Sequence, residues 1–340
     1  MKIAIIGVGA IGGYVGTRLA LAGEEVTFIA RGANLEALRS RGIKLINSDG
    51  SEEQIGSSDI RVTDNYSGAG PQDLVILAMK AHQVEAVTRD IHKLFGAETM
   101  VVPMQNGIPY WYFHRYPGPF AGTRVKSVDP SGALYEKIPC ERVIGCVVYP
   151  AAELAAPAVV KHVEGNRFPV GEPDNSESER VQRVSECLIK SGLQAPVLKD
   201  IRSEIWLKLW GNLSFNPISA LSRATLKEIC EYPPSRAIAA AMMSEAQAVA
   251  TKLGATFRVP LEKRIAGAER VGHHKTSMLQ DVEAARTLEV DALLGSVVEM
   301  ARLTGTATPH MDTVFALTKL LARTLDEQNS QAGSGQLRTA

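Results

Sequence analysis

Three polar side chains in the second half of the chain could do chemistry, because Lys208, Asn212 and Asn216 follow one another at intervals of four residues. At roughly 100° per residue, they form one stripe on a helix. Ile205 falls inside the same arc, so the stripe lies on an apolar face. Burying an ammonium and two amides costs free energy unless they are paired. The segment predicts one of two structures. Lys208 either extends its side chain along a hydrophobic core to reach water, or it lies at the floor of a cleft and meets a polar ligand. We favour the cleft.

A second group of residues that could bind a ligand is the glycine string Gly7-Val8-Gly9-Ala10-Ile11-Gly12. It follows a β-branched run, opens an apolar helical stretch over residues 11–21, and precedes an expected strand over residues 26–30. In this context the spacing is typical of dinucleotide binding: Gly7 permits the turn, Gly9 lets a pyrophosphate approach, and Gly12 lets helix pack on strand. A glycine-rich turn without a ligand is the alternative, and the strand–turn–helix context favours the ligand.

The end of the second strand indicates which dinucleotide binds. NAD-binding versions usually place an acid there, which accepts hydrogen bonds from the ribose hydroxyls. This chain has Arg31 instead. A guanidinium can pair with a 2′-phosphate through two charge-assisted hydrogen bonds. Arg31 could also be an ordinary surface cation, but its position favours NADPH.

The composition excludes several kinds of partner. Lysine plus arginine number 37, as do aspartate plus glutamate, so no net field draws the chain to nucleic acid or to acidic membranes. No apolar run reaches membrane-spanning length. The four cysteines lack CxxC spacing and the side chains of His273 and His274 would diverge, so we expect no metal. Unpaired thiols are typical of reducing compartments, and we expect a cytoplasmic protein.

The elements that must position these residues are of two kinds: strands and helices alternate in the first part of the chain, and helices alone follow. Further strands are expected over residues 73–80, 99–107, 142–149, 159–163 and 168–171, with a helical stretch from about Gln83. This order indicates a doubly wound sheet with a more antiparallel far edge. From about residue 201 the pattern is helical, with a kink or break expected at Pro217 and later segments over residues 221–229, 235–253, 261–268, 277–286, 291–303 and 311–325.

We therefore predict an α/β Rossmann-type dinucleotide-binding domain followed by an all-α C-terminal domain. The first covers residues 1–199 and binds NADP(H), and the second covers residues 200–326 and carries the substrate and catalytic residues. Residues 327–340 are polar without an apolar period, which predicts a disordered tail.

Two more polar residues follow strands of the predicted sheet. Lys80 ends one strand and Asn106 follows the next. Ligands of doubly wound sheets bind outside the carboxyl ends of the strands. Asn106 could bond a cofactor ribose or amide edge, and Lys80 could face a phosphate or a substrate anion. Taken singly, each could equally be an ordinary loop residue.

Taken together, these motifs resemble the ketopantoate reductase (2-dehydropantoate 2-reductase) family over nearly the whole chain. The motifs that carry the resemblance are the glycine string from Gly7 to Gly12, Lys80 with Gln83, Asn106-Gly107, the run Lys208-x3-Asn212-x3-Asn216-Pro217, Ser277-x3-Asp281, and Glu289-x-Asp291. One stretch departs from the family: some members carry a substrate-contacting asparagine where this chain has Ser222-Arg223-Ala224-Thr225.

The resemblance implies an NADPH-dependent reduction of 2-dehydropantoate to pantoate in pantothenate and coenzyme A biosynthesis, with a small 2-keto acid as substrate. It implies that Lys208 is the general acid and that Glu289 orients it or a nicotinamide ribose. The implied cofactor contacts are Gly7, Val8, Gly9, Ala10, Ile11, Gly12, Arg31, Lys80, Gln83, Asn106 and Glu289. The implied substrate contacts are Asn106, Lys208, Asn212, Asn216 and Ser277, with Ser277 serving the carboxylate.

Without the resemblance, Ser277 would be interpreted as a helix cap and Glu289 as a solvated acid. Two other functions stay open at this point. A dehydrogenase of another 2-keto or hydroxy acid could share the two-domain plan, and rates across a panel of keto acids would separate it. A non-catalytic NADPH-sensing module would need the glycine loop and Arg31 but has no use for a buried Lys208. The sequence also leaves the oligomeric state open, with a homodimer among the alternatives.

Overall fold

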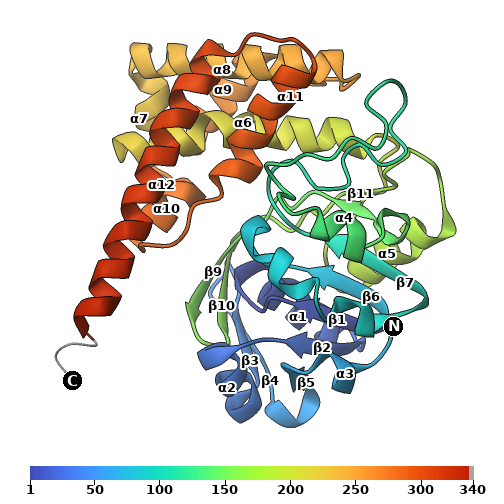
Figure 1. The fold of residues 1–340 in the computed structure, drawn as a ribbon. Helices are drawn as coiled ribbons and strands as arrows, with labels where there is room; N and C mark the ends of the chain where they lie inside the picture. The colour runs from blue at the N-terminus through green and yellow to red at the C-terminus, as the bar shows by residue number, and fades with distance from the viewer. Residues whose placement is uncertain (337–340) are drawn as a thin grey trace. The chain divides into compact units, whose positions relative to one another are not determined.

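The structure is a computed structural model that describes residues 1–336, and it divides into two compact units (Figure 1). The first unit contains residues 1–124 and 129–202. The second contains residues 125–128 and the chain from Ser203 onward. The sequence placed the boundary after residue 199. The structure divides after Arg202 and also assigns a four-residue segment from the middle of the chain to the second unit, which local patterning could not indicate.

A five-stranded parallel sheet forms the centre of the first unit. Its order is β5-β2-β1-β6-β7, and every neighbouring pair is parallel. These strands are β1 (Lys2–Ile6), β2 (Glu25–Ile29), β5 (Arg61–Thr63), β6 (Gln72–Leu77) and β7 (Phe95–Pro103). The inner strands β1 and β6 are near-continuous apolar runs, as parallel strands covered on both faces require.

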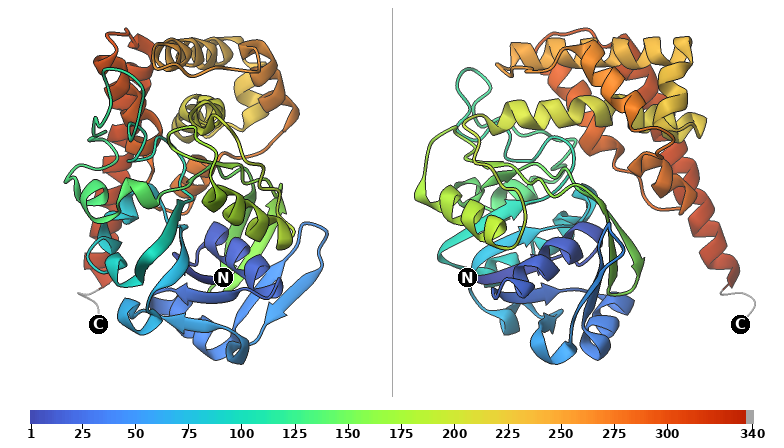
Figure 2. Two further views of the ribbon diagram at one scale, coloured as in Figure 1. Left: turned by 90° about the vertical axis from the view of Figure 1, so that its right-hand side faces the viewer. Right: turned by 180° about the vertical axis from the view of Figure 1, so that it is seen from behind.

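A second sheet of four strands lies across α1 (Ala10–Leu21) from the first, as Figure 2 shows. Its order is β4-β3-β10-β9, with strands β3 (Ile43–Ile46), β4 (Glu52–Ile55), β9 (Ala151–Ala156) and β10 (Val159–Glu164). Glycines on α1 allow both sheets to approach the helix. A Cβ at Gly13 would lie 2.5 Å from Val160 of β10, and one at Gly16 would lie 2.4 Å from Phe28 of β2.

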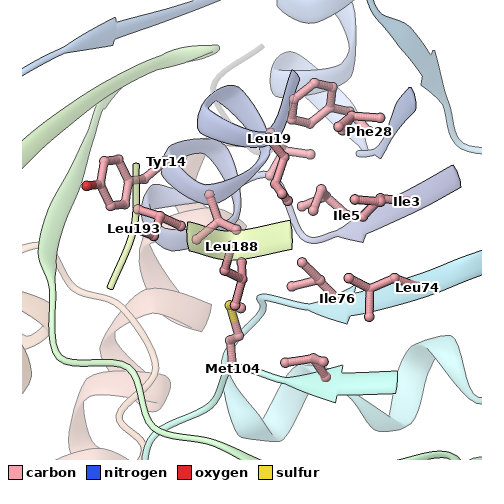
Figure 3. Packing of buried hydrophobic residues seen from close by; sticks show 14 of the residues in the cluster. Ile3, Ile5, Tyr14, Leu19, Phe28, Leu74, Ile76, Met104, Leu188 and Leu193 are labelled. Carbon is pink, nitrogen blue, oxygen red and sulfur yellow. The ribbon is translucent and has the colours of Figure 1, made fainter. Parts of the chain in front are cut away.

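Apolar side chains from α1, the parallel strands and α5 meet in one core, which Figure 3 shows with Leu19, Phe28 and Leu188 among them. The remaining elements of the unit are α2 (Gly32–Arg41), α3 (Tyr66–Ala69), α4 (Ala133–Lys137), α5 (Glu179–Lys190), the short strands β8 (Gly145–Cys146) and β11 (Val170–Gly171), and the 3-10 turns η1 (Ser57–Asp59), η2 (Ala81–Gln83), η3 (Glu85–Val87), η4 (Ile91–Leu94) and η5 (Cys140–Arg142).

Two details of this unit differ from the sequence prediction. The helical stretch expected from Gln83 is a series of 3-10 turns, η2 to η4, and not a continuous α-helix. The antiparallel pairs do not form the far edge of the parallel sheet. They lie in sheets of their own, with β10 against β9, β3 against β4, and β11 against β8. Which strands share a sheet depends on pairing between segments that are distant in sequence. The periodicity of each segment does not predict that pairing.

The described part of the second unit is helical and contains no strand. Its helices are α6 (Ile201–Ser222, whose first two residues belong to the first unit), α7 (Leu226–Glu231), α8 (Pro233–Lys252), α9 (Leu261–Arg270), α10 (Ser277–Glu283), the π-helical turn η6 (Asp291–Gly295), α11 (Ser296–Leu303) and α12 (Pro309–Gln336). No helix in residues 1–336 is long and apolar enough to cross a membrane. The predicted all-helical domain is confirmed.

The helix boundaries differ from expectation at Pro217, at the start of α7 and at the C-terminus. A kink or break was expected at Pro217, and the break does not occur. The α6 helix continues to Ser222 with Pro217 inside it and buried neighbours on both sides. The helix expected from residue 221 begins at Leu226, where Thr225 and Glu228 form a capping box.

The predicted tail is wrong over residues 327–336, because α12 runs to Gln336. Arg323 pairs with Glu327 at 2.7 Å, and the Ser330 hydroxyl donates to the Asp326 carbonyl at 2.8 Å. Such local pairs support a helix without an apolar face. Residues 337–340 of the predicted tail lie outside the described part.

Candidate active site

The glycine string forms the turn between β1 and α1. Gly7 has φ +91°, in the region that favours glycine. A Cβ at Gly12 would lie 2.0 Å from the Gly7 carbonyl oxygen, so the loop closes on itself there. A Cβ at Gly9, in contrast, would meet no atom within 4 Å. Gly9 is the N-cap of α1 and no side chain caps the helix there. The free N–H groups and open space at Gly9 suit a phosphate.

A pocket of about 470 Å³ opens beside this turn, and its walls all belong to the first unit. It brings together five predicted residues: Gly7, Val8, Gly9, Arg31 and Gln83. Ala10, Ile11, Gly12, Lys80 and Asn106 are not among its lining residues. The pocket is also lined by Asn34, Asp64, Tyr66 and Asp90, which the sequence analysis did not assign to the site.

Arg31 stands at the end of β2 as the N-cap of α2, with its side chain exposed. Burial raises the pKa of Tyr66 to about 12, and the nearby Arg31 charge opposes part of that rise. The acids in the pocket have cations of their own: Asp64 pairs with Arg39 at 3.0 Å, and Asp90 pairs with Lys93 at 2.6 Å. Their partners reduce the repulsion that these carboxylates would exert on a 2′-phosphate near Arg31.

Asn34 has a structural role that links the glycine turn to the second sheet. Its Nδ2 donates to the Val8 carbonyl, and its Oδ1 accepts from the Ala158 N–H at 2.7 Å. Because Ala158 is 124 residues away in sequence, no local pattern could have found this role.

Lys80 and Asn106 lie in the loops after β6 and β7. The Lys80 N–H donates to Gln83 Oε1 at 3.3 Å, which fixes the start of η2 and places Gln83 at the pocket. Gln105 joins the two loops, because its Nε2 donates to the carbonyls of Leu77 at 2.6 Å and Met79 at 3.2 Å. Gln105 directly precedes Asn106, but nothing in the local sequence pattern indicates that its side chain joins these loops.

The predicted stripe of the second unit lies on α6. Between residues 201 and 220 every side chain of this helix is buried except Lys208 and Asn212, which are half-buried. They lie one turn apart on the helix. Over residues 201–220, α6 therefore reaches solvent only at these two positions. Asn216, one further turn along, is buried and donates to Ser277 Oγ at 3.4 Å. The structure thus brings two predicted substrate contacts together from segments 61 residues apart.

Ser277 is the first residue of α10, but it is not the cap of that helix. Thr276 is the N-cap, and its hydroxyl accepts from the Leu279 N–H at 3.3 Å. Ser277 is exposed and bonded only weakly, at 3.4 Å, to the Asn216 amide. The interpretation of Ser277 as a cap is therefore wrong, and its hydroxyl faces the α6 stripe.

Glu289 is half-buried and lies two residues before the π-helical turn η6, whose N-cap is Val290. The Leu293 N–H donates to the Glu289 carbonyl at 3.2 Å. π-helical turns are rare and are frequent at functional sites. Asp291, two residues on, pairs with Lys319 of α12 at 2.8 Å.

The observed residues fit a dinucleotide at the glycine turn, because the capless α1 N-terminus, the space at Gly9 and Arg31 border one pocket. Within residues 1–336, no group of histidine, cysteine, aspartate and glutamate side chains could hold a metal ion. Arg31, Gln83 and Asn106 belong to the first unit, and Lys208, Asn212, Asn216, Ser277 and Glu289 belong to the second.

Comparison with known families accounts for both units. The family model described as ketopantoate reductase PanE/ApbA matches residues 3–175, and the model of its C-terminal part matches residues 200–322. The chain belongs to the ketopantoate reductase family. The resemblance predicted from the glycine turn and the α6 stripe is confirmed, and the protein is an oxidoreductase of this family.

Similar proteins match nearly the full length of the chain. A relative from Mesorhizobium japonicum named 2-dehydropantoate 2-reductase is 51% identical over 95% of this chain and 98% of its own. The structure of a candidate ketopantoate reductase from Ralstonia solanacearum MolK2 has a TM-score of 0.90 at 40% identity, covering 95% of this chain and 98% of that one. The D-mandelate dehydrogenase complex with NADH and anilino(oxo)acetate shares the fold, with a TM-score of 0.81 at 23% identity over 96% of this chain and all (100%) of that one.

Proposed function

We propose that this enzyme reduces 2-dehydropantoate to pantoate with NADPH, by hydride transfer to the ketone. The observation that carries the proposal is the α6 stripe, where Lys208 and Asn212 interrupt an otherwise buried helix and Asn216 meets Ser277. The 51% identical relative that bears this enzyme's name supports the choice of substrate.

The residues that would hold the cofactor come first in the proposal. The glycine turn from Gly7 to Gly12 binds the pyrophosphate at the α1 N-terminus, and Arg31 binds the 2′-phosphate. Lys80, Gln83 and Asn106 complete the cofactor contacts after β6 and β7, and Glu289 contributes from the second unit. When bound, NADPH supplies the hydride.

The residues of the second unit bind the keto acid and supply the proton. Lys208 holds a proton as an ammonium and donates it to the ketone oxygen as negative charge develops there. Glu289 orients the Lys208 ammonium or a nicotinamide ribose. Asn212, Asn216 and Ser277 hydrogen-bond the substrate, with Asn106 as a further contact.

The test is the loss of NADPH absorbance with purified enzyme and a panel of 2-keto acids, which includes 2-dehydropantoate, pyruvate and phenylglyoxylate. We expect the highest kcat/KM on 2-dehydropantoate. A higher value on another acid would assign the enzyme to that substrate instead. Tight NADPH binding without turnover of any acid would favour an NADPH-sensing module.

We also propose a cytoplasmic homodimer. All four cysteines are buried thiols that form no disulfide, which suits a reducing compartment. Leu317 and Leu320 on α12 are 50% and 60% exposed, and pairing with a second copy would remove them from water. Light scattering in solution measures the mass, and a monomer would contradict the dimer.

A further inference from the structure

The Asn34 side chain joins two backbone segments at the edge of the dinucleotide pocket. Asn34 is half-buried in the first turn of α2 and lines the pocket together with Val8 and Gly9. Its Nδ2 donates to the Val8 carbonyl, and its Oδ1 accepts from the Ala158 N–H at 2.7 Å. One partner is an acceptor and the other is a donor, so each end of the amide matches one segment only. The amide is therefore held in a single orientation.

The Val8–Gly9 peptide lies at the entry to α1. A trans peptide group is planar, so its carbonyl and its N–H point in opposite directions. The bond from Asn34 to the Val8 carbonyl therefore also sets the direction of the Gly9 N–H. Within residues 1–336 this N–H makes no hydrogen bond, and a Cβ at Gly9 would meet no atom within 4 Å. An unused donor in a residue that lines the pocket suits an anionic oxygen.

The glycine at position 9 makes this peptide orientation easy to lose. Because glycine has no Cβ, it adopts positive and negative φ about equally readily, and the peptide before it can turn over. A turned peptide would present the Val8 carbonyl oxygen where the Gly9 N–H now lies, and that oxygen would repel a phosphate. In the structure Gly9 has φ −85°, and the bond from Asn34 opposes the turn. The Asn34 amide thus stabilises the orientation that offers an N–H.

The other end of the Asn34 amide is anchored in the second sheet. Ala158 lies in the turn between β9 and β10, is buried, and has φ +59°, a left-handed conformation that is uncommon for alanine. Its N–H donates to Asn34, and its carbonyl accepts from the Lys44 N–H of β3 at 2.9 Å. Strained backbone of this kind persists where the surrounding structure holds it, and it is frequent at ligand sites. The turn therefore keeps Asn34 in place before a cofactor binds.

We propose that Asn34 is a positioning residue for cofactor binding, which holds the Val8–Gly9 peptide so that the Gly9 N–H donates to the cofactor pyrophosphate. The inference rests on the proposed function, because it takes a nicotinamide dinucleotide as the ligand of the pocket. Since NADPH and NADH both contain the pyrophosphate, the role of Asn34 is independent of the role of Arg31.

The test compares two ligands by titration calorimetry. One is NADPH, and the other is adenosine 2′-monophosphate, which keeps the 2′-phosphate and lacks the pyrophosphate. The variants are Asn34→Leu, which has a similar size and makes neither hydrogen bond, and Asn34→Ala, which removes the amide without adding bulk. The control is Ser40→Ala, which removes a hydroxyl whose bond to the Ala37 carbonyl, at 3.2 Å, stays within α2.

We expect both Asn34 variants to raise the Kd for NADPH about tenfold, because the pyrophosphate loses a fixed donor. The Kd for adenosine 2′-monophosphate should stay within twofold, because this ligand does not reach the glycine turn with a phosphate. In turnover, the KM for NADPH should rise while kcat at saturating NADPH is retained. Ser40→Ala should change none of these values.

Two results would overturn the proposal. Asn34 variants that bind NADPH as tightly as wild type would show that the amide does not orient the turn. Equal losses of affinity for both ligands would show that Asn34 only stabilises the fold of the pocket.

The same measurements separate this inference from the proposed function. A wild type that reduces no 2-keto acid, but whose NADPH binding is lost selectively in the Asn34 variants, would contradict the reaction and keep the role of Asn34. A wild type that reduces 2-dehydropantoate with NADPH, while Asn34→Leu keeps its KM for NADPH, would contradict the role of Asn34 and keep the reaction.

Discussion

In two of the family motifs, one residue forms an ion pair within the fold and the other is proposed to bind a ligand. Asp281 is buried and pairs with Arg286, and Asp291 pairs with Lys319 of α12. Asp281 holds the loop that follows α10, and Asp291 connects η6 with α12. Ser277 and Glu289 occupy the same two motifs and lie at the start of α10 and just before the π-helical turn η6. The spacing alone could not distinguish these roles, because both kinds of residue are polar and close together in sequence.

Arg31 should set the preference for NADPH over NADH. We expect Arg31→Ala to raise the KM for NADPH roughly ten- to hundredfold, the value of a charge-assisted contact of about 1.5–3 kcal/mol, and to leave NADH kinetics nearly unchanged. Steady-state rates with both cofactors measure this. A wild-type enzyme that uses the two equally would show that Arg31 is an ordinary surface cation.

Asp174 should make stability depend on pH in the acid range. Although burial raises its pKa, the bonds from Ser176 and Arg115 lower that pKa to about 2, and Arg115 lies 3.1 Å away. The folded pKa is below the unfolded value of 3.8, so the stabilisation is present above about pH 4 and is lost as the pH falls towards 2.

Asp174→Asn should therefore lower the free energy of unfolding by about 1 kcal/mol at pH 7. Urea denaturation at pH 7, 5 and 3 should show the difference between wild type and variant shrinking only at the lowest pH. A difference that is the same at all three values would mean that ionisation of Asp174 does not contribute.

At the scale of elements, the glycine turn combines two separate requirements. Gly12 is needed by the fold, since its Cβ would collide with the Gly7 carbonyl, whereas the space beside Gly9 is open. Gly9→Ala should leave the melting temperature near that of wild type and weaken NADPH binding. Gly12→Ala should lower stability by about 1–3 kcal/mol, because the backbone must shift.

Calorimetric melting and NADPH titration of both variants measure these effects. If Gly9→Ala bound NADPH as wild type does, the open side of the turn would not be the phosphate site.

Elements defined by local patterns could be predicted from the sequence, and those defined by distant contacts could not. The βαβ unit, the apolar strand before Lys80 and the helical second unit each have a strong period, and the structure has them. The separate second sheet depends on pairing between strands distant in sequence, such as β3 with β10. The turns after Lys80 are three short 3-10 turns where the pattern predicted one helical stretch. The unbroken helix at Pro217 depends on burial along α6, which a rule for isolated helices does not include.

The candidate site shows the same limit. Arg31 and the Lys208–Asn216 stripe could be found because their positions on a strand end and on a helix follow from nearby residues. The contact between Asn216 and Ser277 could not be found, because only the folded second unit brings these two segments together.

At the scale of the whole molecule, the two units divide the proposed tasks. The dinucleotide pocket is formed by the first unit alone, and the α6 stripe with Ser277 and Glu289 belongs to the second. The second unit also includes residues 125–128, where Glu299 of α11 accepts from the N–H groups of Lys126 and Ser127, both at 2.8 Å. A change on α6 should therefore affect chemistry and leave cofactor binding in place.

The replacement Lys208→Ala tests this account most directly, with kcat on 2-dehydropantoate and the Kd for NADPH measured on the same preparation. A positioned acid contributes about 10²–10⁴ in rate, so kcat should fall at least a hundredfold while the Kd for NADPH stays within a few-fold. Lys199→Ala is the control, because Lys199 is 86% exposed and pairs with Glu177 away from the assigned residues. A Lys208→Ala enzyme with near-normal kcat would contradict the mechanism. Lys208 would then be a lysine whose side chain only extends along the hydrophobic core to water.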